Sequence, residues 1–336
     1  MMMVFSLFAS LGLTWALRRY ALARQVMDIP NARSAHVVPT PRGGGMAVVF
    51  CFLVALPAFV TVVGGDWPVV MALCGGGCLV AAVGFWDDHR PLAPGLRLLA
   101  HFVSAIWVLT WFDGLPAVPL FGIVLESSWW MWGVATVYLV WMLNLYNFMD
   151  GIDGIAGIEA LTVLAGGALL AFCLGQPFLF AVCCLLAAAV LGFLYWNLPP
   201  ARIFMGDGGS GFLGLILGAL SLFAGLTQPQ LLWSWLILLG VFVVDASFTL
   251  ARRLLTGMRV FEAHRTHAYQ YAARRFGAHL PVTAAVAVIN LVWLLPLALV
   301  VALEKLDGAL GLLMAYLPIL IVVARLGAGR AERSPV

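Results

Sequence analysis

The sequence predicts an all-α integral membrane protein with about eleven spanning helices, forming a single membrane domain over residues 1–336. Of the 336 residues, 63% are apolar and 10% are charged. An ordinary soluble domain is roughly 45–50% apolar and about 25% charged, so these charges cannot cover a soluble fold of this size. A disordered chain is excluded for the same reason, and a net charge of +3 is too small to indicate nucleic-acid binding.

Eleven segments are apolar over the roughly 20 residues that a spanning helix needs. The first is expected to be a retained helix and not a cleaved signal peptide, because Arg18 and Arg19 follow its apolar run instead of preceding it. The predicted spans are 3–22, 44–64, 69–86, 95–113, 129–147, 155–174, 177–196, 209–227, 229–250, 281–302 and 308–326.

The arginines indicate how these spans are oriented. With the N-terminus outside and the C-terminus in the cytoplasm, all 17 arginines fall in cytoplasmic segments, whereas the single lysine, Lys305, falls outside. This distribution follows the positive-inside rule. The unusual polar residues lie on the arginine side as well, which predicts an active-site face made of the loops 18–43, 87–97, 197–208 and 251–280.

The first polar motif is a loop of proline, glycine and basic residues between positions 28 and 45. Arg33, His36 and Arg42 are cationic or can become so, and Gly43–Gly45 place backbone N–H groups before a helix. This combination suits a phosphate group. A basic loop under anionic lipid headgroups accounts for the same residues, and the sequence leaves both interpretations open.

The second motif is a pair of adjacent acids, Asp87 and Asp88, at the end of the third apolar segment. Ionisable residues at span ends indicate function by default, because a carboxylate within the membrane is costly. Paired carboxylates can hold Mg²⁺, or act as a base whose pKa is raised by its neighbour. A solvated helix stop is the alternative.

The third motif places Asn144, Asn147, Asp150 and Asp153 at intervals of three residues. On a helix, successive members of this series differ by only about 60° around the axis, so Asn147, Asp150 and Asp153 would share a face. Oxygen-bearing side chains beside glycines at a span end are difficult to explain as packing alone. The motif therefore predicts a metal or phosphate site.

Two further acids stand near span ends. Asp207 lies in a glycine turn before an apolar segment, which fits metal binding or phosphate chemistry, with a helix cap as the alternative. Asp245 lies within the last third of an apolar span, where it either lines a cavity or pairs with Arg252 or Arg253. The sequence does not choose between these two roles.

The last cytoplasmic loop carries His264, Arg265 and His267 among several arginines. Arginine with histidine suits a diphosphate and an attached sugar. The spacing of the two histidines is compatible with zinc, but the absence of further Cys or His nearby argues against such a site. A positive-inside loop explains the arginines of this segment but not the histidines.

Taken together, these motifs predict Mg²⁺-assisted transfer between phosphates at one membrane face, with a carboxylate positioning or deprotonating the attacking group. A sugar-phosphate or lipid transporter is the alternative, but it would place its polar residues near the midplane of broken helices. A CDP-alcohol phosphotransferase is disfavoured, because residues 150–165 contain no Arg.

The motifs resemble those of the polyprenyl-phosphate N-acetylhexosamine-1-phosphate transferases of glycosyltransferase family 4. The resemblance extends from about residue 28 to 275 and keeps the order of the motifs. It implies that undecaprenyl phosphate attacks a UDP-N-acetylhexosamine, giving undecaprenyl-diphosphate-sugar and UMP in the presence of Mg²⁺, or of Mn²⁺ in its place. The residues implied are Asp87 and Asp88 as catalytic groups, Asn147 and Asp207 as metal ligands, Arg42, Asp150, Asp153, His264, Arg265 and His267 for the nucleotide, diphosphate and sugar, and Arg33, His36 and Asp245 for the lipid phosphate or the structure.

The last loop favours one branch of this family. Cell-wall members usually carry three consecutive histidines there, whereas this chain reads His264-Arg265-Thr266-His267. The loop thus resembles the branch that initiates O-antigen and lipopolysaccharide, and it leaves UDP-GlcNAc, UDP-GalNAc, UDP-FucNAc and UDP-QuiNAc open as donors. A multi-pass location in the bacterial inner membrane is implied, and a homodimer is left open beside a monomer.

Overall fold

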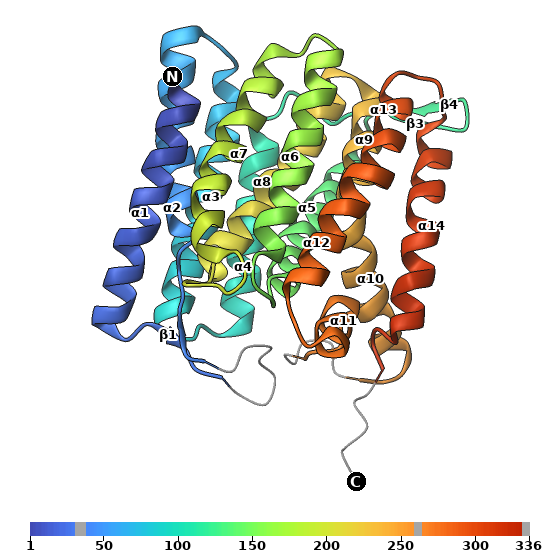
Figure 1. Ribbon diagram of the computed structural model, residues 1–336. Helices are drawn as coiled ribbons and strands as arrows, with labels where there is room; N and C mark the ends of the chain where they lie inside the picture. Colours follow the sequence, from blue (N-terminus) through green and yellow to red (C-terminus); the bar gives the residue numbers. More distant parts are fainter. Residues whose placement is uncertain (31–37, 259–263, 331–336) are drawn as a thin grey trace.

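The computed structural model describes residues 1–30, 38–258 and 264–330. Long helices run side by side between two ends of the molecule, with the N-terminus at one end and the last described residues, 327–330, at the other (Figure 1). The predicted all-α membrane architecture is confirmed. The helices are α1 (Met2–Arg24), α2 (Met46–Val63), α3 (Trp67–His89), α4 (Pro94–Thr110), α5 (Trp129–Met149), α6 (Ile155–Cys173), α7 (Pro177–Asn197), α8 (Asp207–Thr227), α9 (Pro229–Leu238), α10 (Gly240–Leu255), α11 (Ala268–Phe276), α12 (Leu280–Val288), the π-helix η1 (Ile289–Leu294), α13 (Leu295–Ala302) and α14 (Gly308–Leu326).

Every predicted span falls on a helix or on a consecutive series of helices. Within the described ranges, seven helices or helix series are long and apolar enough to cross a membrane, and the bent pair α9–α10 makes an eighth. Helices α1, α4 and α5 do not meet both of these criteria. The total of about eleven spans therefore stays a prediction.

Several local features differ from the expected straight spans and loops. The segment 229–250 is not one helix, because α9 and α10 meet at a bend of 70°. The π-helix η1 interrupts the span 281–302, and the short helix α11 lies within the predicted loop 251–280. Two small antiparallel hairpins pair β1 (Met27–Asp28) with β2 (Thr40–Pro41) and β3 (Val118–Leu120) with β4 (Ile123–Leu125).

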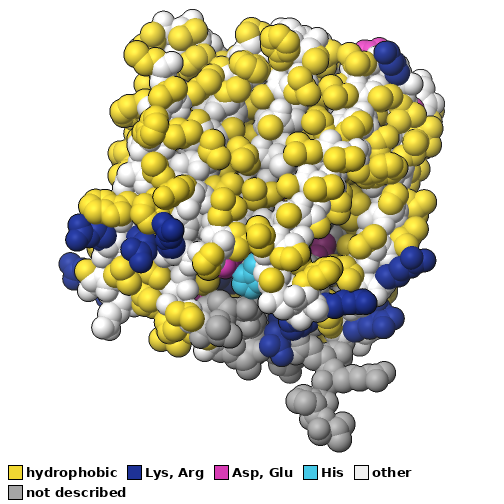
Figure 2. Space-filling model, viewed as in Figure 1, with side chains coloured by type: hydrophobic (Ala, Val, Ile, Leu, Met, Phe, Trp, Pro, Cys, Tyr) yellow, Lys and Arg dark blue, Asp and Glu magenta, His cyan; other side chains and the backbone are white. Residues whose placement is uncertain are grey.

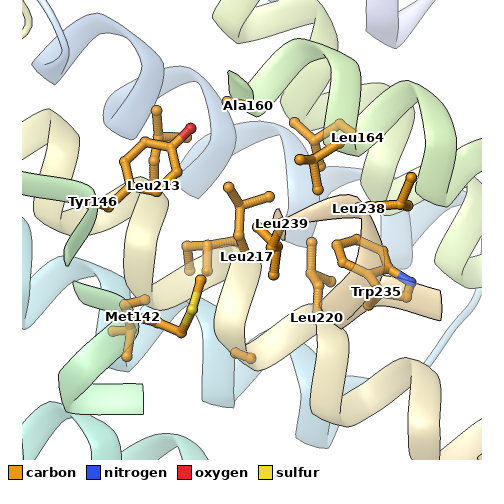
Figure 3. Close-up of a cluster of buried hydrophobic side chains, with 14 of the residues drawn as sticks. Met142, Tyr146, Ala160, Leu164, Leu213, Leu217, Leu220, Trp235, Leu238 and Leu239 are labelled. Carbon is orange, nitrogen blue, oxygen red and sulfur yellow. The ribbon is translucent and has the colours of Figure 1, made fainter. Parts of the chain in front are cut away.

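Helix α8 is the centre of the fold. Its apolar window is 94% buried, as expected for a helix that is apolar on all sides. Leu213, Leu217 and Leu220 of this helix pack against Met142 and Tyr146 of α5 and against Trp235 of α9 (Figure 3). The most enclosed helix of the protein therefore begins at Asp207, which fixes that residue firmly in space.

Glycines bring two neighbouring helices against the start of α8. A Cβ atom on Gly84 of α3 would lie 2.5 Å from the Cα atom of Gly208. A Cβ atom on Gly45, directly before α2, would lie 2.6 Å from the Cα atom of Gly209. Small residues permit this close approach between helices. As a result, the end of α3 and the loop before α2 lie beside Asp207.

A polar cluster lies deep among the spans, where the sequence analysis singled out no residue. The Asn290 amide, on η1, donates hydrogen bonds to Glu159 Oε2 and Thr162 Oγ1, both at 2.7 Å. The Glu159 carboxyl, which is fully buried, also faces the backbone N–H of Phe242 in the first turn of α10. A helix that begins within a bend has free N–H groups, and Glu159 supplies an acceptor for one of them.

Candidate active site

The Lys and Arg side chains gather mainly at the end of the molecule where α14 ends, below a broad hydrophobic belt (Figure 2). A cavity of about 740 Å³ lies among α3, α4, α5, α8 and α10. Most of its wall is apolar, and polar side chains are concentrated where these helices begin or end. The polar lining residues are Asp87, Arg97, His101, Asn144, Asn147, Asp207 and Ser247.

Asp87 and Asp207 face each other across this polar end and share one arginine. The Arg97 guanidinium donates to Asp87 Oδ2 at 2.6 Å and lies 3.7 Å from Asp207 Oδ2. The backbone N–H of Leu92 holds the second oxygen of Asp87 at 2.6 Å. Two carboxyl groups thus share a single guanidinium at the cavity.

Asp88 is turned the other way and is not among the described residues that line the cavity. Its side chain is 1% exposed, and its two oxygens accept the backbone N–H groups of Asp207 at 3.1 Å and Gly208 at 3.5 Å. The Arg42 guanidinium donates to the Asp88 backbone carbonyl and lies 3.8 Å from its carboxylate. Asp88 therefore caps the first turn of α8, where free N–H groups favour an anion.

Asn147, the other predicted metal ligand, lies on the same cavity as Asp207. The Ser210 hydroxyl is 2.7 Å from Asn147 Oδ1 and 3.1 Å from the Gly206 carbonyl oxygen. Ser210 thereby connects the end of α5 to the first turn of α8. The Asn147 amide oxygen and the two carboxylates are hard oxygen donors, which suit Mg²⁺.

Asp150 and Asp153 are close in sequence but lie in different surroundings. Asp150 ends α5 in a partly exposed position, and the surrounding protein, with the negative charges of Asp88 and Asp153, raises its pKa to about 7. Asp153 is buried: one of its carboxylate oxygens accepts the backbone N–H of Ala201 at 2.9 Å, and the other lies 3.1 Å from His279 Nδ1. The Asp153 carboxylate thus joins three separate segments.

Asp245 neither lines the cavity, among the residues described, nor pairs with an arginine in a described contact. Its oxygens accept the backbone N–H groups of Ala268 at 2.9 Å and Tyr269 at 3.0 Å, and His267 Nδ1 lies 3.5 Å away. Asp245 therefore caps the N-terminus of α11 from a neighbouring helix. Neither of the two roles predicted from its position in the span therefore holds among the described contacts, and the geometry fits the structural role that the family resemblance left open beside lipid-phosphate binding.

His264 and His267 stack on each other, with ring centroids 4.9 Å apart. The outer faces of His267 meet the rings of Phe148 and Tyr269. Burial, followed by the positive charges of His267 and Arg253, lowers the pKa of His264 to about 3. His264 is therefore neutral at physiological pH, and it can donate or accept a hydrogen bond without carrying charge. The backbone carbonyl of Arg265 accepts a hydrogen bond from Arg274 at 3.1 Å.

Two of the glycine N–H groups that the sequence offered to a phosphate have partners within the protein. Gly44 and Gly45 donate to the carbonyl oxygens of Phe204 and Met205, both at 2.9 Å. The glycines before α2 and in the first turn of α8 permit close packing of the two segments, and phosphate binding by the loop stays a prediction. Arg33 and His36 lie outside the described residues.

Sequence reasoning missed three polar side chains that line the cavity, namely Arg97, His101 and Ser247. Arg97 stands in the first turn of α4, ten residues after Asp87, and His101 follows one turn later and contacts the Asn144 amide at 3.2 Å. Sequence reasoning also missed Ser210, which does not line the cavity but holds Asn147 by a hydrogen bond. The useful signal was an arginine and a histidine one helical turn apart at the start of an apolar helix.

Comparison with known proteins identifies the family. The model of glycosyl transferase family 4 matches residues 70–225, a stretch that holds all the cavity-lining acids. A phospho-N-acetylmuramoyl-pentapeptide-transferase of Moorella thermoacetica is 31% identical over 245 residues, which cover 68% of this chain and 74% of that protein. The chain belongs to glycosyl transferase family 4.

Two further relatives differ from each other in name and in coverage. A probable undecaprenyl-phosphate N-acetylglucosaminyl 1-phosphate transferase of Bacillus subtilis is 28% identical over 79% of this chain and 74% of that protein. A phospho-N-acetylmuramoyl-pentapeptide-transferase of Synechococcus elongatus is 33% identical over 62% of this chain, but the match spans only 58% of that protein. The family is shared, whereas the sugar in the names differs.

Proposed function

We propose that this protein transfers N-acetylhexosamine-1-phosphate from a UDP-sugar to undecaprenyl phosphate and releases UMP. The observation that carries this proposal is the cavity, whose apolar wall ends at Asp87, Asp207 and Asn147. A polyprenyl chain requires an apolar surface, and its phosphate requires a charged site at one end of that surface. The cavity combines both in one space.

The relatives support the same substrate class. One is named for transfer of N-acetylglucosaminyl 1-phosphate to undecaprenyl phosphate, and others for transfer of phospho-N-acetylmuramoyl-pentapeptide. Both names describe the transfer of a phosphate-linked amino sugar. The reaction class is therefore supported more strongly than the identity of the sugar.

The donor set of the cavity fits Mg²⁺, with Mn²⁺ as a substitute. Mg²⁺ is usually bound by one or two carboxylates and by substrate phosphates and water. Asp87, Asp207 and Asn147 offer these oxygens, and Arg97 neutralises only part of the acidic charge. When bound, the ion would polarise the diphosphate of the donor.

The protein groups then divide the remaining work. Asp87, on the cavity wall, would receive a proton from the lipid phosphate or orient it for attack. Arg97 would bind the phosphates with its guanidinium, which already lies between the two carboxylates. Asp88 would position Asp207 by capping the helix on which it stands.

For the donor, we propose UDP-GlcNAc, UDP-GalNAc or a 6-deoxy analogue such as UDP-FucNAc or UDP-QuiNAc, and not UDP-MurNAc-pentapeptide. The reason is the loop His264–His267, which lacks three consecutive histidines. The reaction would be the first membrane step of O-antigen, lipopolysaccharide or a related glycan at the bacterial inner membrane.

The test is release of UMP by the purified protein with undecaprenyl phosphate, Mg²⁺ and each UDP-sugar in turn. The proposal predicts release with at least one UDP-N-acetylhexosamine and loss of release when Mg²⁺ is chelated. A Gly95→Trp variant sharpens the test, because Gly95 lines the cavity and has open space around it. It should raise the KM for undecaprenyl phosphate and leave the KM for the UDP-sugar unchanged. Failure of every donor to release UMP would contradict the proposal.

A further inference from the structure

A short segment after the last helix contacts the histidine loop. It consists of Gly327–Arg330, and its first three residues are buried. We propose that this segment, the C-terminal clamp, positions the loop His264–His267 for the UDP-sugar. The inference rests on the proposed function only for the identity of the ligand, because the clamp itself is defined by contacts.

Three hydrogen bonds attach the clamp to the structures around the loop. The Gly329 backbone N–H donates to the Thr266 carbonyl oxygen at 2.8 Å. The Tyr271 hydroxyl, on α11, donates to the Arg330 carbonyl oxygen at 3.0 Å. Arg252, at the end of α10, donates to the Ala328 carbonyl oxygen at 3.2 Å. The clamp therefore ties α10, the loop and α11 to the end of α14.

Thr266 passes this restraint on to His264. Its hydroxyl lies 3.0 Å from His264 Nδ1, and the Arg253 guanidinium lies 3.5 Å from the same hydroxyl. Thr266 is 4% exposed, so water does not readily replace these partners. Asp245 restrains the other side of the loop by capping α11. The loop is therefore restrained on both sides, by Asp245 on one side and by the clamp on the other.

Gly329 is the residue on which the clamp depends. Its φ of 72° lies in the left-handed region, which favours glycine. A Cβ atom there would also lie 2.9 Å from the Thr249 carbonyl oxygen and 3.0 Å from Arg252 Cβ. A side chain at this position must push the clamp away from α10 and separate Gly329 from Thr266.

Hydrogen–deuterium exchange of the full-length, ligand-free protein tests the clamp without relying on activity. Gly329→Ala should speed exchange of the 264–271 segment about five- to tenfold, which corresponds to the loss of one or two hydrogen bonds. The matched control is Gly175→Ala, which has a similar φ of 66° but no atom near the added methyl group. It should leave exchange of this segment unchanged. Tyr271→Phe provides a milder variant that should speed the same segment by a smaller factor.

The kinetic readout then connects the clamp to the donor. Gly329→Ala should raise the KM for the UDP-sugar about five- to tenfold, which corresponds to the loss of about one hydrogen bond to this substrate. The KM for undecaprenyl phosphate should stay within twofold of the wild-type value. Unchanged exchange in both clamp variants would overturn the clamp. Faster exchange with an unchanged KM for the UDP-sugar would overturn its positioning role. Absence of any UMP release from the wild type would instead contradict the proposed function and leave the exchange result standing.

Discussion

The acids of this protein fall into two regions that the sequence does not separate. In the cavity, the carboxylates of Asp87 and Asp207 face open space and share a single arginine. Behind the cavity, the carboxylates of Asp88 and Asp245 accept two backbone N–H groups each and are almost fully buried. The first region can bind a ligand, whereas the second fixes the start of a helix.

The contrast between cavity-lining and helix-capping carboxylates indicates that acids near one membrane face do not all have the same role. Removal of a buried carboxylate that caps a helix leaves its N–H partners without an acceptor, so the substitution should mainly reduce stability. A carboxylate on a cavity wall costs stability to maintain, so its removal should mainly reduce turnover. Turnover and stability should therefore respond differently to substitutions in the two regions.

The largest effect is expected for Asp207→Asn. Under the proposed function, Asp207 binds the metal and the reacting phosphates, so the loss of its carboxylate should lower kcat for UMP release by about 10³-fold or more. The melting temperature should stay at or above that of the wild type, because a site of like charges loses repulsion. A kcat that stays within tenfold of the wild type would remove Asp207 from the catalytic site.

Asp245→Ala should show the opposite behaviour. Two backbone N–H groups at the start of α11 lose their buried acceptor, so the free energy of unfolding should fall by about 3 kcal/mol. Asp113→Ala is the control, because Asp113 is exposed. Thermal unfolding in detergent measures both variants, and equal melting temperatures for the two would refute the capping role.

Ser210→Ala should change the metal requirement. Without the hydroxyl, Asn147 Oδ1 loses its 2.7 Å partner and is less well oriented. Groups that orient a metal ligand typically contribute about 10- to 100-fold in metal affinity. The Mg²⁺ concentration for half-maximal UMP release should therefore rise about tenfold, with kcat at saturating Mg²⁺ much less affected. An unchanged Mg²⁺ titration would argue that Asn147 is not a ligand.

The smallest effect concerns the pH dependence of stability. The pKa of His264 is lowered to about 3, below the value of about 6.5 expected in the unfolded chain. The unfolded state therefore takes up this proton first, and stability falls as the pH drops below about 6.5 towards 3. His264→Gln removes this contribution, so the melting temperature of the variant should fall less than that of the wild type between pH 7 and pH 5. Parallel curves for the two proteins would contradict the assignment.

The positions of the helices could be predicted from the sequence because a membrane imposes a simple rule. A segment of about 20 apolar residues must satisfy its own backbone hydrogen bonds, and a helix does so. Composition alone does not reveal where a helix bends. Beside the break between α9 and α10, the backbone N–H of Phe242 meets Glu159, which accepts a hydrogen bond from Asn290, 131 positions further along the chain.

Only part of the candidate site could be predicted in the same way. The motifs indicate which carboxylates are present, but the direction of each side chain depends on packing between helices. Asp87 and Asp88 show this most clearly, because adjacent residues on a helix point about 100° apart. Arg97 lies in the sequence between Asp87 and Asp207 and belongs to neither motif. Only the packing of α3, α4 and α8 brings its guanidinium to both carboxyl groups.

The most direct test of the division between the two regions compares Asp87→Asn with Asp88→Asn. UMP release per folded molecule and the melting temperature are measured for both variants at saturating Mg²⁺. We predict that Asp87→Asn loses kcat by at least tenfold more than Asp88→Asn and keeps the wild-type melting temperature, whereas Asp88→Asn melts at a lower temperature. Equal losses of kcat with equal melting temperatures, or the reverse order, would contradict the account.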